Sequence, residues 1–98
     1  MVVFADSPSD AHLERQRNLM VEMGGEALER DLISIEAVGP DAKAGALRRQ
    51  LGVGEESFVA VLVGKDGGSK IISKEPLASE RLMTIIDAMP MRQQEMRR

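Results

Sequence analysis

The residues with the clearest chemical potential form one short polar stretch near the N-terminus. Asp6, Ser7, Ser9 and Asp10 follow an apolar segment and precede a helix-forming segment. Free backbone N–H groups and the positive end of the helix dipole make such a turn receptive to anions. Serine and aspartate are also the usual residues at a helix N-cap. The turn is therefore a candidate binding site, and simple capping of the helix by Ser7 and Asp10 explains the same residues.

His12, the only histidine, stands close to this turn. A catalytic triad of Ser7, His12 and Asp10 would need a histidine oriented by the carboxylate, together with donors for an oxyanion. Positions 10 and 12 point to different faces of a helix, so an ordinary surface histidine is expected. The stretch 64–68, Gly-Lys-Asp-Gly-Gly, lacks the Gly-Lys-Ser/Thr ending of a phosphate loop and leads into a strand, which indicates a hairpin turn. No ligand spacing for a metal stands out, and we expect no metal and no cofactor.

Composition sets limits on the class of protein. A chain of 98 residues holds one domain with a thin core, built from aliphatic residues and seven methionines because Phe4 and Phe58 are the only aromatic residues. The formal charge of −3 argues against a nucleic-acid partner, and the absence of cysteine excludes disulfide and thiol chemistry. No apolar run approaches the roughly 20 residues of a membrane span. No signal peptide is visible, so the chain as written predicts a cytoplasmic protein, or a periplasmic or secreted one if it is a mature fragment.

Hydrophobic patterns and turn residues predict seven elements. The run 58–63 is apolar throughout and is typical of a strand covered on both faces. Ser7 is expected to cap the first helix with Pro8 at its first position, and Ser79 to cap the last. Gly24 and Gly25 break the first helix near residue 23. The predicted strands are 2–5, 32–38, 58–63 and 70–74, and the predicted helices are 7–23, 42–51 and 79–89.

The order β-α-β-α-β-β-α predicts an α/β fold. A strand-helix-strand unit places its two strands parallel, and a closing hairpin adds two antiparallel strands. The economical arrangement is a four-stranded mixed sheet in the order 2-1-3-4, which lies between helices and has the first and third strands in its centre. Lysines on the fourth strand and polar residues on the second are typical of edge strands. This is the layout of the thioredoxin fold.

Two segments resemble the thioredoxin-like P-DUDES family. They are 58–68, Phe-Val-Ala-Val-Leu-Val-Gly-Lys-Asp-Gly-Gly, and 86–97, Ile-Asp-Ala-Met-Pro-Met-Arg-Gln-Gln-Glu-Met-Arg. That family contains stand-alone bacterial domains of unknown function and modules of sushi-repeat and matrix-associated extracellular proteins. The resemblance implies a peroxiredoxin-like architecture.

The same resemblance places a reactive site at the turn after the first strand. The sequence Ser7-Pro8-Ser9-Asp10 is similar to the peroxiredoxin Cys-Pro-Thr-Glu pattern, with serine in the position of the peroxidatic cysteine. No Cys-x-x-Cys motif is present, and no proline occurs between Leu51 and Phe58, where a thioredoxin keeps its cis-proline. A serine hydroxyl cannot pass through sulfenic acid and disulfide as a thiolate does. We expect no thiol-based oxidoreductase activity.

The C-terminal residues form a second candidate site. Residues 1–90 are expected to make the domain, and residues 91–98 a short basic tail that contains methionine. Met91, Arg92, Met96 and Arg97 would make a soft cationic surface for a partner. We expect Met91, and with it Met96, to pack on the domain, while Arg92, Arg97 and Arg98 face solvent or a partner.

These observations favour a non-catalytic thioredoxin-like binding or interaction module that lacks the redox cysteines. The alternative is a small-molecule-binding protein, or a weak non-redox enzyme, that uses the turn at the first-helix N-terminus. A structural homodimer formed through an edge strand is a third hypothesis. A concave pocket at that turn favours the second hypothesis and a flat apolar patch the third. A protein partner or a second copy is expected, and neither nucleic acid nor membrane.

Overall fold

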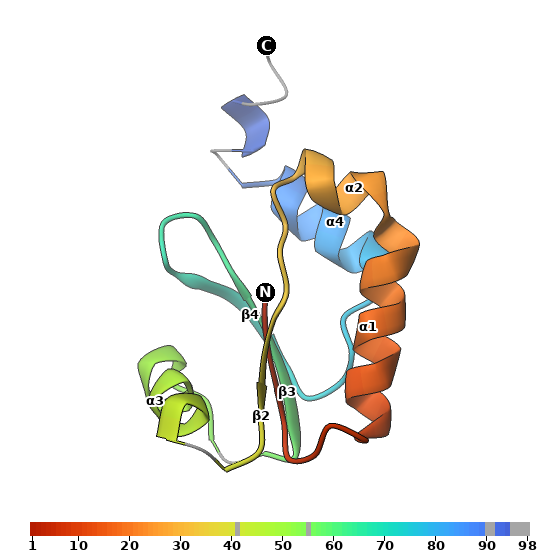
Figure 1. Ribbon diagram of the computed structural model, residues 1–98. Coiled ribbons are helices and arrows are strands. Elements are labelled where there is room, and N and C mark those ends of the chain that lie inside the picture. Colours follow the sequence, from red (N-terminus) through yellow and green to blue (C-terminus); the bar gives the residue numbers. More distant parts are fainter. Residues whose placement is uncertain (41, 55, 90–91, 95–98) are drawn as a thin grey trace.

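The apolar run predicted as a central strand forms β3 (Phe58–Val63), and the other elements are arranged around it (Figure 1). The structure is a computed structural model, and it describes residues 1–40, 42–54, 56–89 and 92–94. The remaining elements are β1 (Val2–Ala5), α1 (Ala11–Met23), α2 (Gly25–Glu29), β2 (Ile35–Val38), α3 (Ala42–Leu51), β4 (Ser69–Ser73) and α4 (Ser79–Asp87).

The four strands form one mixed sheet in the order β2-β1-β3-β4, which confirms the predicted α/β fold and strand order. β1 pairs in parallel with β2 and antiparallel with β3, and β3 pairs antiparallel with β4. All four residues of β1 are buried, as are the first five of β3. Burial on both faces is the reason that these two strands read as unbroken apolar runs.

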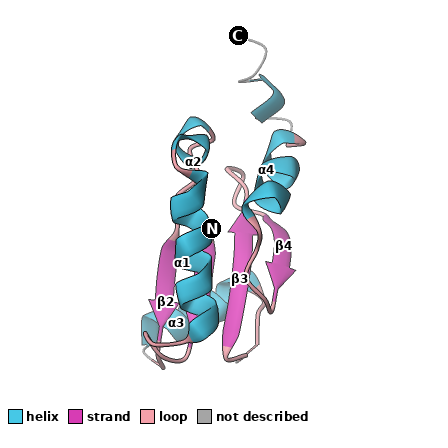
Figure 2. Cartoon of the chain, turned by 90° about the vertical axis from the view of Figure 1, so that its right-hand side faces the viewer, coloured by secondary structure: helices cyan, strands magenta, loops and turns pink. Residues whose placement is uncertain are grey.

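Helices cover the two faces of the sheet unequally. α1, α2 and α4 lie on one face, while α3 alone lies on the other (Figures 1 and 2). The first layer buries Leu13, Leu62 and Leu82 among its largest side chains. The second layer centres on Phe4, and the Arg48 guanidinium lies 4.9 Å from the centre of its ring. Cation–π contact and packing of the aliphatic stem explain why an arginine is buried there.

β2 is shorter than predicted. It begins at Ile35 rather than at residue 32, because β1 pairs from Val2 onward and Val2 lies opposite Ile35. Ile33 and Ile35 are exposed, and Ala37 is buried beneath α3. The edge position expected for this strand is confirmed.

Contrary to the prediction, Ser7 and Ser79 are not the N-caps of α1 and α4, whereas the expected capping by Asp10 is confirmed. Asp10 caps α1, and its Oδ1 accepts hydrogen bonds from the backbone N–H groups of His12 and Leu13 at 2.8 and 3.1 Å. Ser7 lies three residues earlier, in a turn of its own, so it cannot reach these groups. Ala78 occupies the N-cap of α4, where Ser79 is the first helical residue and no side chain caps the helix.

The predicted breaks at glycine are confirmed. α1 ends at Met23, and α2 begins at Gly25 after Gly24 takes a positive φ of 50°. The β3–β4 connection is the expected hairpin turn. In it the Gly64 N–H donates to the Gly68 carbonyl at 2.9 Å, and Gly67 has a φ of 86°. Glycine adopts this left-handed conformation without steric cost.

One buried polar side chain joins α1 to the segment before α4. Gln16 is 1% exposed, and its Nε2 donates to the Leu77 carbonyl at 3.0 Å while its Oε1 accepts from the Leu77 N–H at 2.6 Å. The amide thus satisfies both backbone groups of a buried residue, as a neighbouring strand would.

Candidate functional site

Hydrogen bonds within and around the polar turn after β1 hold its side chains in place. The Ser7 hydroxyl lies 2.9 Å from the Ser9 hydroxyl and accepts from the Ser9 N–H at 3.2 Å. The Asp6 N–H donates to the Ser57 carbonyl at 3.1 Å, and the Asp10 N–H donates to the Ser7 carbonyl at 3.1 Å. The structure therefore brings Ser7 and Ser9 together, and the Ser7 hydroxyl helps to shape the turn.

His12 does not complete a triad with these residues. Its Nδ1 lies 3.9 Å from Asp10 Oδ1, which is beyond hydrogen-bonding distance, and its ring packs 5.4 Å from the centre of Phe58. Within the described part of the chain, no hydrogen bond joins His12 to Ser7. The Asp10 carboxylate accepts hydrogen bonds from the first backbone N–H groups of α1. An incoming anion would therefore meet a negative charge there rather than free N–H donors.

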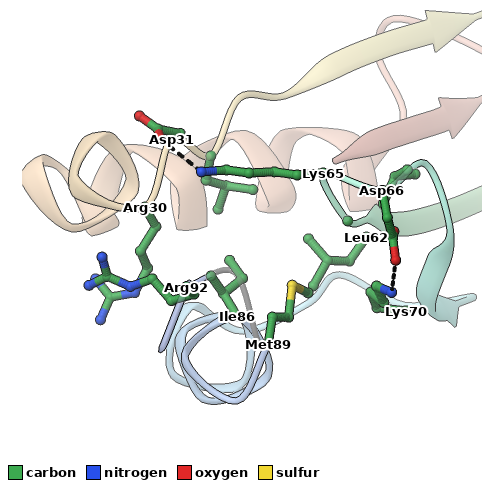
Figure 3. A pocket seen from close by; sticks show the side chains of 12 residues that line it. Arg30, Asp31, Leu62, Lys65, Asp66, Lys70, Ile86, Met89 and Arg92 are labelled. Atoms are coloured by element: carbon green, nitrogen blue, oxygen red, sulfur yellow. Dashed lines mark hydrogen bonds and ion pairs between the residues drawn. The ribbon is translucent and has the colours of Figure 1, made fainter. Parts of the chain in front are cut away.

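A cavity lies at the opposite end of the sheet, where β3 ends and α4 approaches the hairpin turn. Its volume is about 90 Å³, and the link between α2 and β2, the hairpin turn and the end of α4 form its walls (Figure 3). Its apolar side chains come from the link, from the end of β3 and from α4 with the residues after it: Leu32, Leu62, Val63, Ile86 and Met89. Its charged side chains lie around them: Arg30, Asp31, Lys65, Asp66, Lys70 and Arg92.

Two ion pairs border the cavity on the hairpin side. Lys65 Nζ reaches Asp31 Oδ2 at 3.0 Å, so the hairpin contacts the link before β2, and Lys70 Nζ lies 2.9 Å from Asp66 Oδ2 (Figure 3). The Gly68 N–H, and after it Lys70, hold the pKa of Asp66 below its usual range. The Lys70 side chain lies across Gly64, where an added Cβ would be 2.5 Å from Lys70 Cε.

A network of ion pairs centred on Asp87 borders the other side of the cavity, at the ends of α2 and α4. Arg30 binds the Asp87 carboxylate with two nitrogens, Nε at 2.9 Å and Nη2 at 2.8 Å, and donates to Glu26 Oε2 at 2.6 Å. Arg92 donates to Asp87 Oδ1 at 3.1 Å and to Glu29 Oε1 at 3.0 Å. The Arg30 guanidinium, and after it Arg92, lower the pKa of Asp87. One carboxylate thus compensates two guanidinium groups that are each less than 10% exposed.

The structure corrects the expectation for Arg92. This residue is 7% exposed and faces the domain, because Asp87 and Glu29 pair with its guanidinium. Residues 92–94 form a helical turn, and Gln93 donates from Nε2 to the Asp87 carbonyl at 3.0 Å. The other residues named for the C-terminal surface, Met91, Met96 and Arg97, lie outside the described residues, and so does Arg98.

Sequence reasoning missed Arg30 and Asp87. Two signals were present: the spacing of Glu26 and Arg30, which suits an ion pair on a helix, and the positions of Asp87 and Arg92 within one short segment. Among the described residues, no group of three or more histidine, aspartate or glutamate side chains is arranged to hold a metal ion. No helix in the described part of the chain is both long and apolar enough to cross a membrane.

Fold and site together define an α/β protein with a four-stranded mixed sheet and a small, charge-bordered cavity at one end of it. Residues 1–95 match the model of the family described as a domain of unknown function (DUF4174), and the chain belongs to this family. A search of curated proteins found no match. A search of solved structures found none either.

Proposed function

We propose that this protein is a non-catalytic binding or interaction module with a thioredoxin-like fold that lacks the redox centre of that fold. The strand order supports the thioredoxin-like part of the proposal, since β1 and β3 lie in the centre and a β3–β4 hairpin closes the sheet. The resemblance of residues 58–68 and 86–97 to the P-DUDES family supports it from the sequence.

The observation that carries the proposal is the state of the Ser7 side chain. In the peroxiredoxin pattern that Ser7-Pro8-Ser9-Asp10 resembles, the reactive cysteine stands at the position of Ser7. Here its hydroxyl is held by Ser9, and the first amide groups of α1 are occupied by Asp10. A serine nucleophile needs an adjacent base, and the groups that hydrogen-bond to the Ser7 hydroxyl belong to Ser9, which is not a base. The chain contains no cysteine that could act in its place.

The cavity beside α4 supports the binding part of the proposal. Apolar side chains from separate parts of the chain converge there, and side chains of both charges surround them. Pockets of this composition are typical binding sites. The walls come from a helix end, a hairpin turn and the link between α2 and β2, and ion pairs tie these parts together, which favours a preformed site.

A peroxide assay on the wild-type protein and the titration of introduced cysteines test the proposal. The wild-type protein should reduce no peroxide in the presence of a thiol reductant, beyond a heat-denatured control. In a Ser7→Cys variant the thiol should titrate at or above the ordinary value of about 8.5, because Asp10 occupies the helix N-terminus that would otherwise stabilise a thiolate.

Ser69→Cys, at an exposed position of β4, is the matched control and should titrate near the ordinary value. A Ser7→Cys thiol that titrates below about 7 would show that the turn stabilises a thiolate, and would contradict the charge that Asp10 is argued to place there. Peroxide turnover by the wild-type protein would refute the proposal directly.

A further inference from the structure

The size of the cavity beside α4 restricts what it can bind. Its volume of about 90 Å³ is smaller than the roughly 150 Å³ of an engineered protein cavity that holds benzene. It is also well below the several hundred cubic ångströms of a usual small-molecule site. It is too small to enclose a cofactor or a nucleotide. One aliphatic side chain does, and Leu62, Ile86 and Met89 provide an apolar surface for it (Figure 3).

The cations around the cavity do not favour an anionic guest. The side chains of Arg30 and Arg92 are 9% and 8% exposed and bind carboxylates of the protein itself. Lys65 pairs with Asp31, and Lys70 pairs with Asp66. An anion that approached Arg30 or Arg92 would have to displace a carboxylate from a nearly buried guanidinium group.

The carboxylates, in contrast, are the groups that face solvent. Asp31 is 68% exposed against 41% for Lys65, and Asp66 is 60% exposed against 33% for Lys70. The same asymmetry holds on the other side, where Glu26 and Glu29 are more than half exposed and their arginine partners are nearly buried. Around the cavity, the carboxylates are therefore more exposed than the cations with which they pair, and this exposed carboxylate surface complements a cationic partner.

We propose that this cavity is a docking site for a basic segment of a partner polypeptide, which inserts one aliphatic side chain and places its cationic neighbours against Asp31 and Asp66. Exposed ion pairs contribute little to stability, so Asp31 and Asp66 can take up cations of a partner at little cost. This inference depends on the proposed binding function and adds the location of the site and the chemistry of the partner.

NMR titration of the isotope-labelled protein with short peptides tests the inference. The probe is an acetylated and amidated Arg-Arg-Leu-Arg-Arg peptide, with Arg-Arg-Ser-Arg-Arg and Glu-Glu-Leu-Glu-Glu as controls. The leucine peptide should shift the backbone amides of Leu32, Gly64 and Ile86 and should bind at least about tenfold more tightly than the serine peptide, because only leucine buries apolar surface. The glutamate peptide should not bind.

Two pairs of variants localise the effect. Met89→Lys places a charge in the cavity and should weaken binding of the leucine peptide by about tenfold or more. Met83→Lys adds the same charge to α4 outside the cavity and should leave the affinity within about twofold. Asp31→Asn should weaken binding roughly twofold to fivefold at low salt, whereas Glu80→Gln, at an exposed position of α4, should not.

Several outcomes would overturn the inference. Equal affinities for the leucine and serine peptides would show that charge alone attracts the probe, and shifts spread over the acidic surface would show the same. Binding of the glutamate peptide would reverse the assignment of charge. If Met89→Lys does not fold, the three peptides still test the site on the wild-type protein. Leucine-specific binding together with peroxide turnover by the wild-type protein would leave this inference standing while the non-catalytic part of the proposed function failed.

Discussion

Replacing Gln16 by leucine should destabilise the protein, although it makes the buried face of α1 more apolar. The substitution keeps the approximate size of the side chain but removes both hydrogen bonds to Leu77, whose N–H and carbonyl are buried. Each buried backbone group left without a partner costs roughly 1–3 kcal/mol, and the additional apolar burial offsets only part of this. The expected loss is about 2–4 kcal/mol in the free energy of unfolding, which is a large share of the stability of a small domain.

Thermal and urea unfolding followed by far-ultraviolet circular dichroism measure this loss, since the chain has no tryptophan or tyrosine for fluorescence. A domain of this size loses roughly 4–8 °C in Tm per kcal/mol, so Gln16→Leu should fall by at least about 8 °C. Gln50→Leu, at an exposed position of α3, is the matched control and should change stability by no more than about 0.5 kcal/mol. An unchanged Tm for Gln16→Leu would refute the reasoning, because it would mean that Leu77 needs no polar partner.

A second substitution at the same position separates lost hydrogen bonds from lost packing. In Gln16→Glu the introduced carboxylate accepts from the Leu77 N–H but cannot donate to its carbonyl, and burial raises the pKa of the introduced carboxyl. Its protonated form restores the donor. A group with a raised folded-state pKa contributes its full stability below the unfolded value of about 4.3 and loses it as pH rises through the folded value. The deficit relative to wild type should therefore be smaller at about pH 4 than at pH 7.

Two further predictions test the cap and the ionic network. Asp10→Ala should lower the free energy of unfolding by about 1 kcal/mol, and Ser7→Ala should lower it less, because Asp10 accepts hydrogen bonds from the first backbone N–H groups of α1. Urea unfolding of the two variants measures both losses, and equal losses would contradict the assigned cap. Asp87→Asn should lower the Tm at neutral pH and reduce the acid sensitivity of stability. The pKa of Asp87 is lowered in the folded state, so the stability that it contributes is present above its unfolded value and is lost as pH falls through the folded one. An equal fall in Tm between pH 7 and about pH 3 in wild type and variant would show that Asp87 carries none of this dependence.

The sheet could be predicted because its pattern is encoded locally. A strand buried on both faces must be apolar throughout, and only Val2–Ala5 and Phe58–Val63 meet this condition. The crossover rule and the short hairpin turn then leave few ways to order the other strands. The ends of elements were less predictable. Ser7 and Asp10 are both good caps by residue type, and the difference between them depends on where the chain leaves β1.

Gln16 shows why a buried polar contact is hard to predict. It lies three residues after Leu13 and four before Met20, so the helical period places it on the buried face of α1. Its polarity suggests the opposite. The partner that resolves the conflict, Leu77, is 61 residues away, and its need for a donor and an acceptor follows only from the packed structure. The same holds for Arg30 and Asp87, which are 57 residues apart.

Asp87 connects the stability of the domain with the shape of the proposed docking site, although it does not line the cavity. Its carboxylate holds Arg30 at the end of α2 and Arg92 after α4, and both arginines line the cavity. Without it, two nearly buried guanidinium groups would lose a shared anion, and Arg92 would keep Glu29 as its carboxylate partner among the described residues. The segment 86–97, singled out in the sequence for its resemblance, thus contains the carboxylate and one of the arginines that position the cavity wall. Asp87 and Arg92 help to close this end of the fold, and a partner that docks there would contact a surface that this ion network keeps in place.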